Sequence, residues 1–198
     1  MLVLSACCAL FHLANAAMLP LVGHKLSQTS PALATTLTAA CIVAAQLVMV
    51  PAALLVGSRA DAWGRRPLLL AAFAILPLRG VLYLLSDAPA WLLGVQLLDG
   101  VGAGIFGALL PVIVSDLTQG TGRFNVTLGA VSTAFGLGAA FSPGLAGMIV
   151  QFAGYDVAFL TLAAIAVLAF VLAMALPETR PRARDANAPA TPPSNARL

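Results

Sequence analysis

Residues 157–176 read VAFLTLAAIAVLAFVLAMAL, twenty consecutive residues without a charged side chain. As an α-helix rising 1.5 Å per residue, this run is ~30 Å long, which matches the hydrocarbon core of a bilayer. In hydrocarbon every backbone N–H and C=O needs an internal partner, and the run lacks the alternation of a barrel strand. It therefore predicts a transmembrane helix.

Five more apolar stretches of similar length precede it: residues 2–22, 32–56, 67–85, 90–114 and 126–150. Short polar connectors separate them, so neighbouring helices are expected to run antiparallel. The predicted fold class is all-α integral membrane, a bundle of six transmembrane helices within residues 1–178. Residues 179–198 are polar and rich in proline, which predicts a disordered cytoplasmic tail.

The composition excludes several classes of function. Hydrophobic residues make up 61% of the chain and charged residues 9%, against roughly 25% charged in a soluble domain. The net charge of +3 is small and the arginines lie in short connectors, so nucleic-acid binding is not expected. Cys7, Cys8 and Cys41 lie in apolar runs without metal-ligand spacing, so no metal or other cofactor is expected. His12 and His24 are isolated from any serine or cysteine motif, so no catalytic residue and no enzyme is predicted.

The distribution of basic residues predicts the orientation in the membrane. Only Lys25 follows an odd-numbered apolar run. Eight arginines follow even-numbered runs: Arg59, Arg65, Arg66, Arg123, Arg180, Arg182, Arg184 and Arg197. Because basic residues favour cytoplasmic connectors, both termini are predicted to be cytoplasmic in a multi-pass protein of the cell membrane.

The connector after the second run reads Gly57-Ser-Arg-Ala-Asp61-Ala-Trp-Gly64-Arg65-Arg66. It resembles the G-x-x-x-D-[RK]-x-G-R-[RK] signature of the major facilitator superfamily, with an alanine in place of the basic residue after the aspartate. The two glycines permit a tight turn, the carboxylate precedes a helix start, and the two arginines can meet anionic headgroups.

The resemblance implies a gating role for this signature. In the family its aspartate pairs with a basic residue of another helix when the cavity faces outward, and Arg123 is the candidate partner of Asp61. The alternative is that Arg59, Arg65 and Arg66 serve only as topology anchors.

The fifth run carries a second resemblance, to the glycine–proline motif of antiporter-like members, at Gly129, Gly138, Pro143 and Gly147. Ser142 and Ala146 stand where that motif has glycines, so no antiport mechanism is carried over. The alternative is structural, because small residues let membrane helices approach closely and proline bends a helix.

Residues 11–20 and 116–125 look like parts of the C-terminal half of such transporters. The resemblance implies one of two six-helix halves around a central cavity, which transports a small solute by alternating access. It therefore implies a partner bundle, either a missing N-terminal half or a second copy in a homodimer. The alternative is a non-transporting bundle, or an inactive truncated fragment, with a structural or partner-binding role.

Two charges lie inside the predicted helices. Arg79 is ~16 Å from the cytoplasmic end of its run and Asp99 is ~13 Å from the outer end of the next, so their depths coincide. An unpaired charge there costs at least roughly 3 kcal/mol, which predicts an ion pair. As a functional hypothesis, Arg79 binds an anionic group of the solute and Asp99 exchanges a proton, with Gln96 on the same helix face.

His12 and Asn15 are three residues apart in the first run. A polar pair in a membrane helix is usually turned inward, which makes both residues candidates for solute contact. The alternative is interhelical hydrogen bonding that only fixes the packing.

Overall fold

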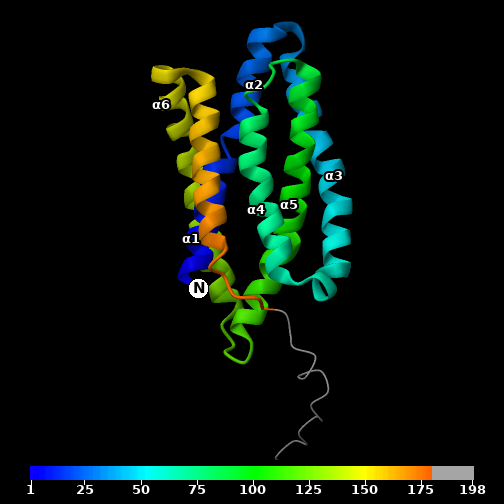
Figure 1. Cartoon of the computed structure of the whole chain (residues 1–198), viewed down its shortest axis with the longest axis vertical. Coiled ribbons are helices and arrows are strands. Elements are labelled where there is room, and N and C mark those ends of the chain that lie inside the picture. The colour runs from blue at the N-terminus through cyan, green and yellow to red at the C-terminus, as the bar shows by residue number, and fades with distance from the viewer. Residues whose placement is uncertain (180–198) are drawn as a thin grey trace, which may run out of the picture.

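The computed structural model describes residues 1–179, and these residues form helices and turns without a strand (Figure 1). The elements are α1 (Leu2–Asn15), α2 (Met18–Thr29), the 3-10 helix η1 (Pro31–Leu33), α3 (Ala34–Trp63), α4 (Arg65–Leu82), α5 (Pro89–Thr118) and α6 (Phe124–Ala173). The predicted all-α class is confirmed.

The long element α6 consists of two helices joined at Gly154. This residue has φ +85°, a left-handed conformation that favours glycine, and the chain turns back there. With α1 and α2 taken as one interrupted path, the described chain therefore passes six times between the two ends of the bundle. We call one end of the bundle the Gly64 end, because it holds the turns at Gly64 and at residues 119–123. We call the opposite end the Gly154 end.

Helix pairs pack closely where glycines remove the side chain. α1 packs along α6, α3 packs along α5, and α4 contacts both α5 and α6. A Cβ added to Gly138 would lie 2.1 Å from the carbonyl oxygen of Ala9, and one added to Gly100 would lie 2.1 Å from that of Ala45. The two close pairs, α1 with α6 and α3 with α5, are thus held at backbone contact.

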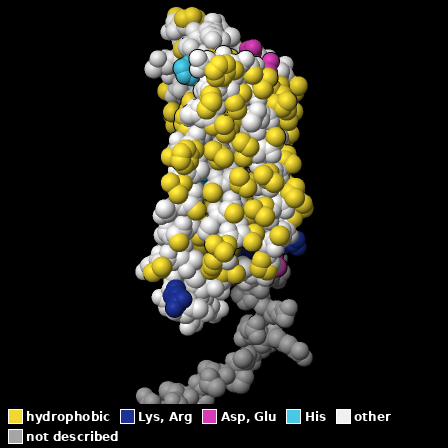
Figure 2. Space-filling view, turned by 90° about the vertical axis from the view of Figure 1, so that its left-hand side faces the viewer, with side chains coloured by type: hydrophobic (Ala, Val, Ile, Leu, Met, Phe, Trp, Pro, Cys, Tyr) yellow, Lys and Arg dark blue, Asp and Glu magenta, His cyan; other side chains and the backbone are white. Residues whose placement is uncertain are grey.

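The surface of the bundle suits a lipid environment. Figure 2 shows hydrophobic side chains over most of the height of one face, with the visible charged side chains near its two ends. Leu47, Leu54 and Phe141 are each about 70% exposed. Within the described residues, four helical segments are long and apolar enough to cross a membrane: residues 2–29, 31–63, 89–118 and 124–173. α4 carries three arginines in its eighteen residues and is not among them.

Several boundaries differ from the sequence prediction. α5 continues to Thr118, beyond the predicted end at 114, and the predicted gap between residues 150 and 157 is reduced to Gly154. The expected connector at residues 57–66 is helical through Trp63, so Gly57 lies inside α3 and only Gly64, with φ +89°, makes the turn. The expected continuous first helix is interrupted at Ala16 and Ala17. Pro20 has no N–H to donate to the Ala16 carbonyl, and the Ala17 N–H donates to the Ser142 hydroxyl at 2.9 Å. The predicted tail lies, from residue 180 onward, outside the described residues.

Candidate functional site

A group of polar side chains lies inside the bundle at the point where α1 ends. The Arg79 guanidinium, on α4, donates from Nη1 to Asn15 Oδ1 at 2.7 Å and forms an ion pair with Asp99 of α5. Gln96 Nε2 donates to Asp99 Oδ2 at 3.0 Å, and the Tyr83 hydroxyl donates to Gln96 Oε1 at 2.6 Å. We call these five residues the Arg79 cluster. Arg79 and Asp99 thus form the ion pair that their coincident depths predict.

Exposure within the Arg79 cluster is uneven. The Arg79 side chain is 1% exposed, whereas the Asp99 side chain is 24% exposed. Gln96 is buried, and Arg79 Nε has no hydrogen-bond partner within residues 1–179. The carboxylate is therefore the charge of the cluster that remains accessible, while the guanidinium is enclosed by its acceptors.

His12 does not join Asn15 in this cluster. Its Nδ1 lies 3.0 Å from the Cys8 carbonyl oxygen, and its ring stacks on Phe135 with centroids 4.4 Å apart. The ring also contacts Phe106 edge-on at 5.1 Å. The two residues of the predicted polar pair consequently have different surroundings, and only Asn15 contacts the buried charges.

The signature residues form a second network at the Gly64 end, which we call the Arg65 cluster. Arg65 pairs with Asp61 at 2.7 Å and with Asp116 at 3.1 Å. The Glu178 carboxylate accepts the backbone N–H groups of Arg65 at 3.0 Å and Arg66 at 3.1 Å. This network joins α3, α4, α5 and the segment after α6.

Asp61 has a partner that the sequence analysis did not name. It pairs with Arg65, four residues on across the Gly64 turn, and its pairing with Arg123 in an outward-facing state stays a prediction. Arg123 lies at the N-cap position of α6. Sequence reasoning also missed Asp116 and Glu178 as members of the network. Both are acidic residues predicted to lie at the same end as Arg65, and that was the available signal.

A third network, the Lys25 cluster, lies at the Gly154 end and was not predicted. Lys25 of α2 pairs with Asp87 at 2.6 Å and with Asp156 at 3.3 Å, and its ammonium lies 5.4 Å from the Phe159 ring centroid. The two aspartates come from the α4–α5 connector and from the residues after Gly154. Opposite charges in neighbouring connectors were the signal in the sequence.

The predicted packing residues of α6 divide into two pairs. Gly138 contacts the backbone of α1, and Pro143 follows Ser142, whose hydroxyl holds the break between α1 and α2. Gly129 and Gly147 have no atom within 4 Å of an added Cβ, so they contact no neighbouring helix of the described chain.

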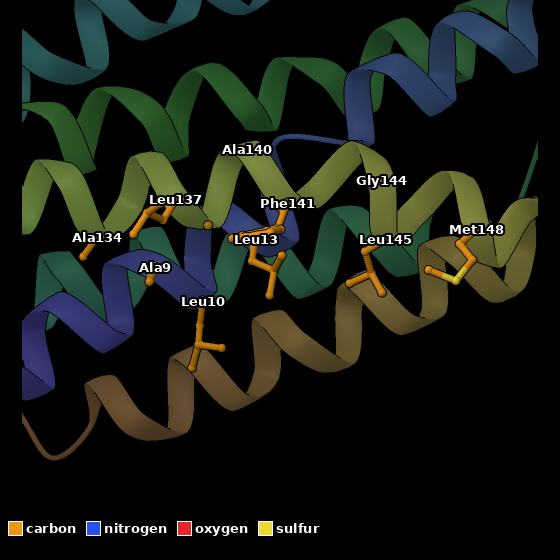
Figure 3. A pocket seen from close by; sticks show the side chains of 11 residues that line it. Ala9, Leu10, Leu13, Ala134, Leu137, Ala140, Phe141, Gly144, Leu145 and Met148 are labelled. Atoms are coloured by element: carbon orange, nitrogen blue, oxygen red, sulfur yellow. The ribbon is translucent and has the colours of Figure 1, made fainter.

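An apolar groove of about 840 Å³ runs between α1 and α6. Leu10 and Leu13 of α1 and Phe141 and Met148 of α6 line it (Figure 3). Its lining includes no charged or amide side chain and no member of the Arg79 cluster. Within residues 1–179 no group of histidine, cysteine or acidic side chains is arranged to hold a metal ion.

These observations define a helical membrane protein with an ion pair between its helices and a network of acidic and basic side chains at the Gly64 end. The sequence profile of the Major Facilitator Superfamily matches residues 1–197, and the chain belongs to this family. Members are membrane transporters and not enzymes.

Two relatives agree with this assignment. Both are named as uncharacterized MFS-type transporters of Mycobacterium tuberculosis, from strains CDC 1551 / Oshkosh and ATCC 25618 / H37Rv. Each is 58% identical to the chain over 180 residues, which cover 90% of this chain and 43% of the relative. The chain thus spans less than half the length of these relatives.

Proposed function

We propose that the chain is one six-helix bundle of a secondary transporter, which moves a small solute by alternating access together with a second bundle. The second bundle is either the remainder of a longer transporter, as the length of the relatives favours, or a second copy of this chain. The Lys and Arg distribution supports a cell-membrane location with both termini, and hence the Gly64 end, on the cytoplasmic side.

The observation that carries this proposal is the partial exposure of Asp99 inside the Arg79 cluster. A charge in the hydrocarbon region costs at least roughly 3 kcal/mol, so an ion pair used only for packing is expected to be enclosed on both sides. Instead the Asp99 carboxylate is 24% exposed beside a guanidinium that is 1% exposed. An accessible carboxylate at this depth suits a solute-binding and proton-exchanging group that faces a water-filled cavity.

The position of the Arg79 cluster supports the same role. Asn15 belongs to the α1–α6 pair, Gln96 and Asp99 belong to the α3–α5 pair, and Arg79 reaches them from α4, which contacts α5 and α6. The cluster therefore lies where two tightly packed pairs meet, and a change in their spacing would alter its contacts. The Arg65 cluster joins four segments at the Gly64 end and is proposed as the gating contact there.

The test is proton movement coupled to solute addition. The chain, purified from its native host with any bundle that accompanies it, is reconstituted into liposomes that contain a pH-sensitive dye. Solutes are added by chemical class, and Asp99→Asn is compared with Asp156→Asn, whose carboxyl lies at the exposed Gly154 end. We expect Asp99→Asn to abolish solute-driven proton movement and Asp156→Asn to retain it. Full activity of Asp99→Asn would contradict the role given to this carboxylate.

A further inference from the structure

Gln46 is an exposed amide in the middle of the most exposed membrane helix. Only 11% of the most apolar stretch within residues 31–63 is buried inside the bundle. Large exposed apolar side chains surround Gln46 on the surface of α3. The Gln46 side chain is exposed and makes no hydrogen bond to another described residue. A primary amide that faces hydrocarbon loses its hydrogen bonds to water without replacement, so the position is unfavourable unless water or a polar group covers it.

The contact between α3 and α5 fixes the depth of Gln46. A Cβ on Gly100 would lie 2.1 Å from the Ala45 carbonyl oxygen, so residues 45 and 100 are level. Gln46 and Asp99 are their immediate neighbours in the sequence. The exposed amide of α3 and the accessible carboxylate of α5 therefore lie within ~3 Å of the same depth.

Helix periodicity places both side chains on the same face of the α3–α5 pair. A groove of about 350 Å³ is lined by Met49, Val50 and Ala53 of α3 and by Ala103 of α5, among others. Gln46 precedes Met49 and Val50 by one turn, and Asp99 precedes Ala103 by one turn. Both helices run from the Gly154 end toward the Gly64 end. Gln46 and Asp99 therefore extend the groove by one helical turn toward the Gly154 end.

We propose that Gln46 lines the transport cavity beside Asp99 and contacts the solute, an inference that rests on the proposed function. The pair offers a carboxylate acceptor and a neutral amide, whereas the positive charge of Arg79 is enclosed at 1% exposure. This face recognises a solute with a hydrogen-bond donor, such as an ammonium or hydroxyl group, and disfavours an anion.

The experiment measures water access at position 46 by thiol labelling. Gln46→Cys is compared with Leu47→Cys, a matched control 100° further around α3 and 71% exposed in the bundle. The variants are labelled in native-host membranes with membrane-impermeant cationic and anionic methanethiosulfonates. The native cysteines are at most 1% exposed, and the unmodified chain gives the background.

Because only a hydrated thiol ionises and reacts, we expect Gln46→Cys to label at least about tenfold faster than Leu47→Cys. The cationic reagent should react faster than the anionic one, and Asp99→Asn should remove this preference. Equal labelling at positions 46 and 47 would overturn the proposal.

An Asp99→Cys variant separates the two possible failures. If Asp99→Cys reacts while Gln46→Cys reacts no faster than Leu47→Cys, the cavity exists and Gln46 lies outside it. If neither Asp99→Cys nor Gln46→Cys reacts, the cavity itself is absent, and the proposed function fails together with the role of Gln46.

Discussion

The middle of the bundle and its two ends use the same chemistry in different surroundings. Each of the three clusters has one nearly buried basic residue with acidic partners from other segments. In the middle, Arg79 pairs with a carboxylate that is 24% exposed, whereas at the Gly154 end Lys25 pairs with Asp87 and Asp156, which are 58% and 76% exposed. The middle and the Gly154 end thus differ in how much solvent reaches the acidic partners, whereas the Gly64 end is mixed, with Asp61 88% and Asp116 21% exposed.

This difference predicts how much each cluster contributes to stability. Ion pairs with well-hydrated partners contribute little, because water replaces the contact when it breaks. A desolvated pair behaves differently, since removing one partner leaves an uncompensated charge that solvent cannot reach. The Lys25 cluster is therefore expected to contribute less to stability than the Arg79 cluster.

The largest effect is expected from Asp99→Ala. The variant leaves the Arg79 charge enclosed without its counter-ion, so the free energy of unfolding should fall by about 3–5 kcal/mol. Denaturant titration in detergent, followed by the loss of helical signal, measures this change.

The double variant Arg79→Met, Asp99→Leu is the control for this prediction. It removes both charges and should recover most of the lost stability while remaining inactive in transport. If Asp99→Ala alone destabilised no more than a surface substitution, the middle of the bundle would be as hydrated as its ends, and the comparison would fail.

Close packing in the middle gives the next largest effect. Gly138→Ala places a Cβ 2.1 Å from the Ala9 carbonyl oxygen, so α1 and α6 must separate, and the free energy of unfolding should fall by about 1–3 kcal/mol. Gly147→Ala is the matched control, with nothing within 4 Å, and should be neutral or stabilising because alanine favours the helix. Equal thermal midpoints for the two variants would contradict the tight α1–α6 contact.

Glu178→Ala tests the Arg65 cluster. The Glu178 carboxylate accepts two backbone N–H groups at the start of α4, where the helix dipole also favours a negative charge. Its loss should cost about 1–2 kcal/mol and accelerate hydrogen exchange in the first turn of α4. Glu178→Gln retains an oxygen acceptor, so its stability and its exchange rates should lie between those of the unmodified chain and those of Glu178→Ala. Unchanged exchange at the amides of Arg65, Arg66 and Leu68 would show that this contact does not hold the helix end.

The sequence was sufficient for the fold class but not for all of the boundaries. Apolar length determines where a membrane helix can lie, and this quantity is local. The break after Asn15 has a local signal that apolar length does not register, Pro20, which cannot donate to the Ala16 carbonyl, and a distant contact, the Ser142 hydroxyl that accepts the Ala17 N–H. Gly57 was placed in a turn because glycine permits one, yet the chain needs a positive φ only at Gly64.

The candidate site was predictable where depth alone decides contact. Arg79 and Asp99 could be paired from their distances along two helices, and the pair formed. Tyr83 was missed because a tyrosine near the end of an apolar run resembles its apolar neighbours in the sequence. Only the structure shows that its hydroxyl donates a hydrogen bond to Gln96. Arg65 was missed as a partner of Asp61 because the sequence does not show that the turn at Gly64 brings these two residues within 2.7 Å. The pairing of Asp61 with Arg123, which the family resemblance implies for the outward-facing state, stays a prediction.

The smallest effect is expected from Lys25→Met, at the other extreme of the comparison. The substitution removes the ammonium that lies 5.4 Å from the Phe159 ring centroid and leaves an apolar side chain of similar length in its place. Both released aspartates are already hydrated, so the free energy of unfolding should change by no more than about 1 kcal/mol. Added salt screens the same pairs, so the difference between Lys25→Met and the unmodified chain should shrink further between low and high ionic strength. Salt should leave the Asp99→Ala deficit nearly unchanged, because ions do not reach the enclosed guanidinium. A salt-insensitive loss at Lys25 as large as that at Asp99 would mean that exposure of the acidic partner does not govern the strength of these pairs.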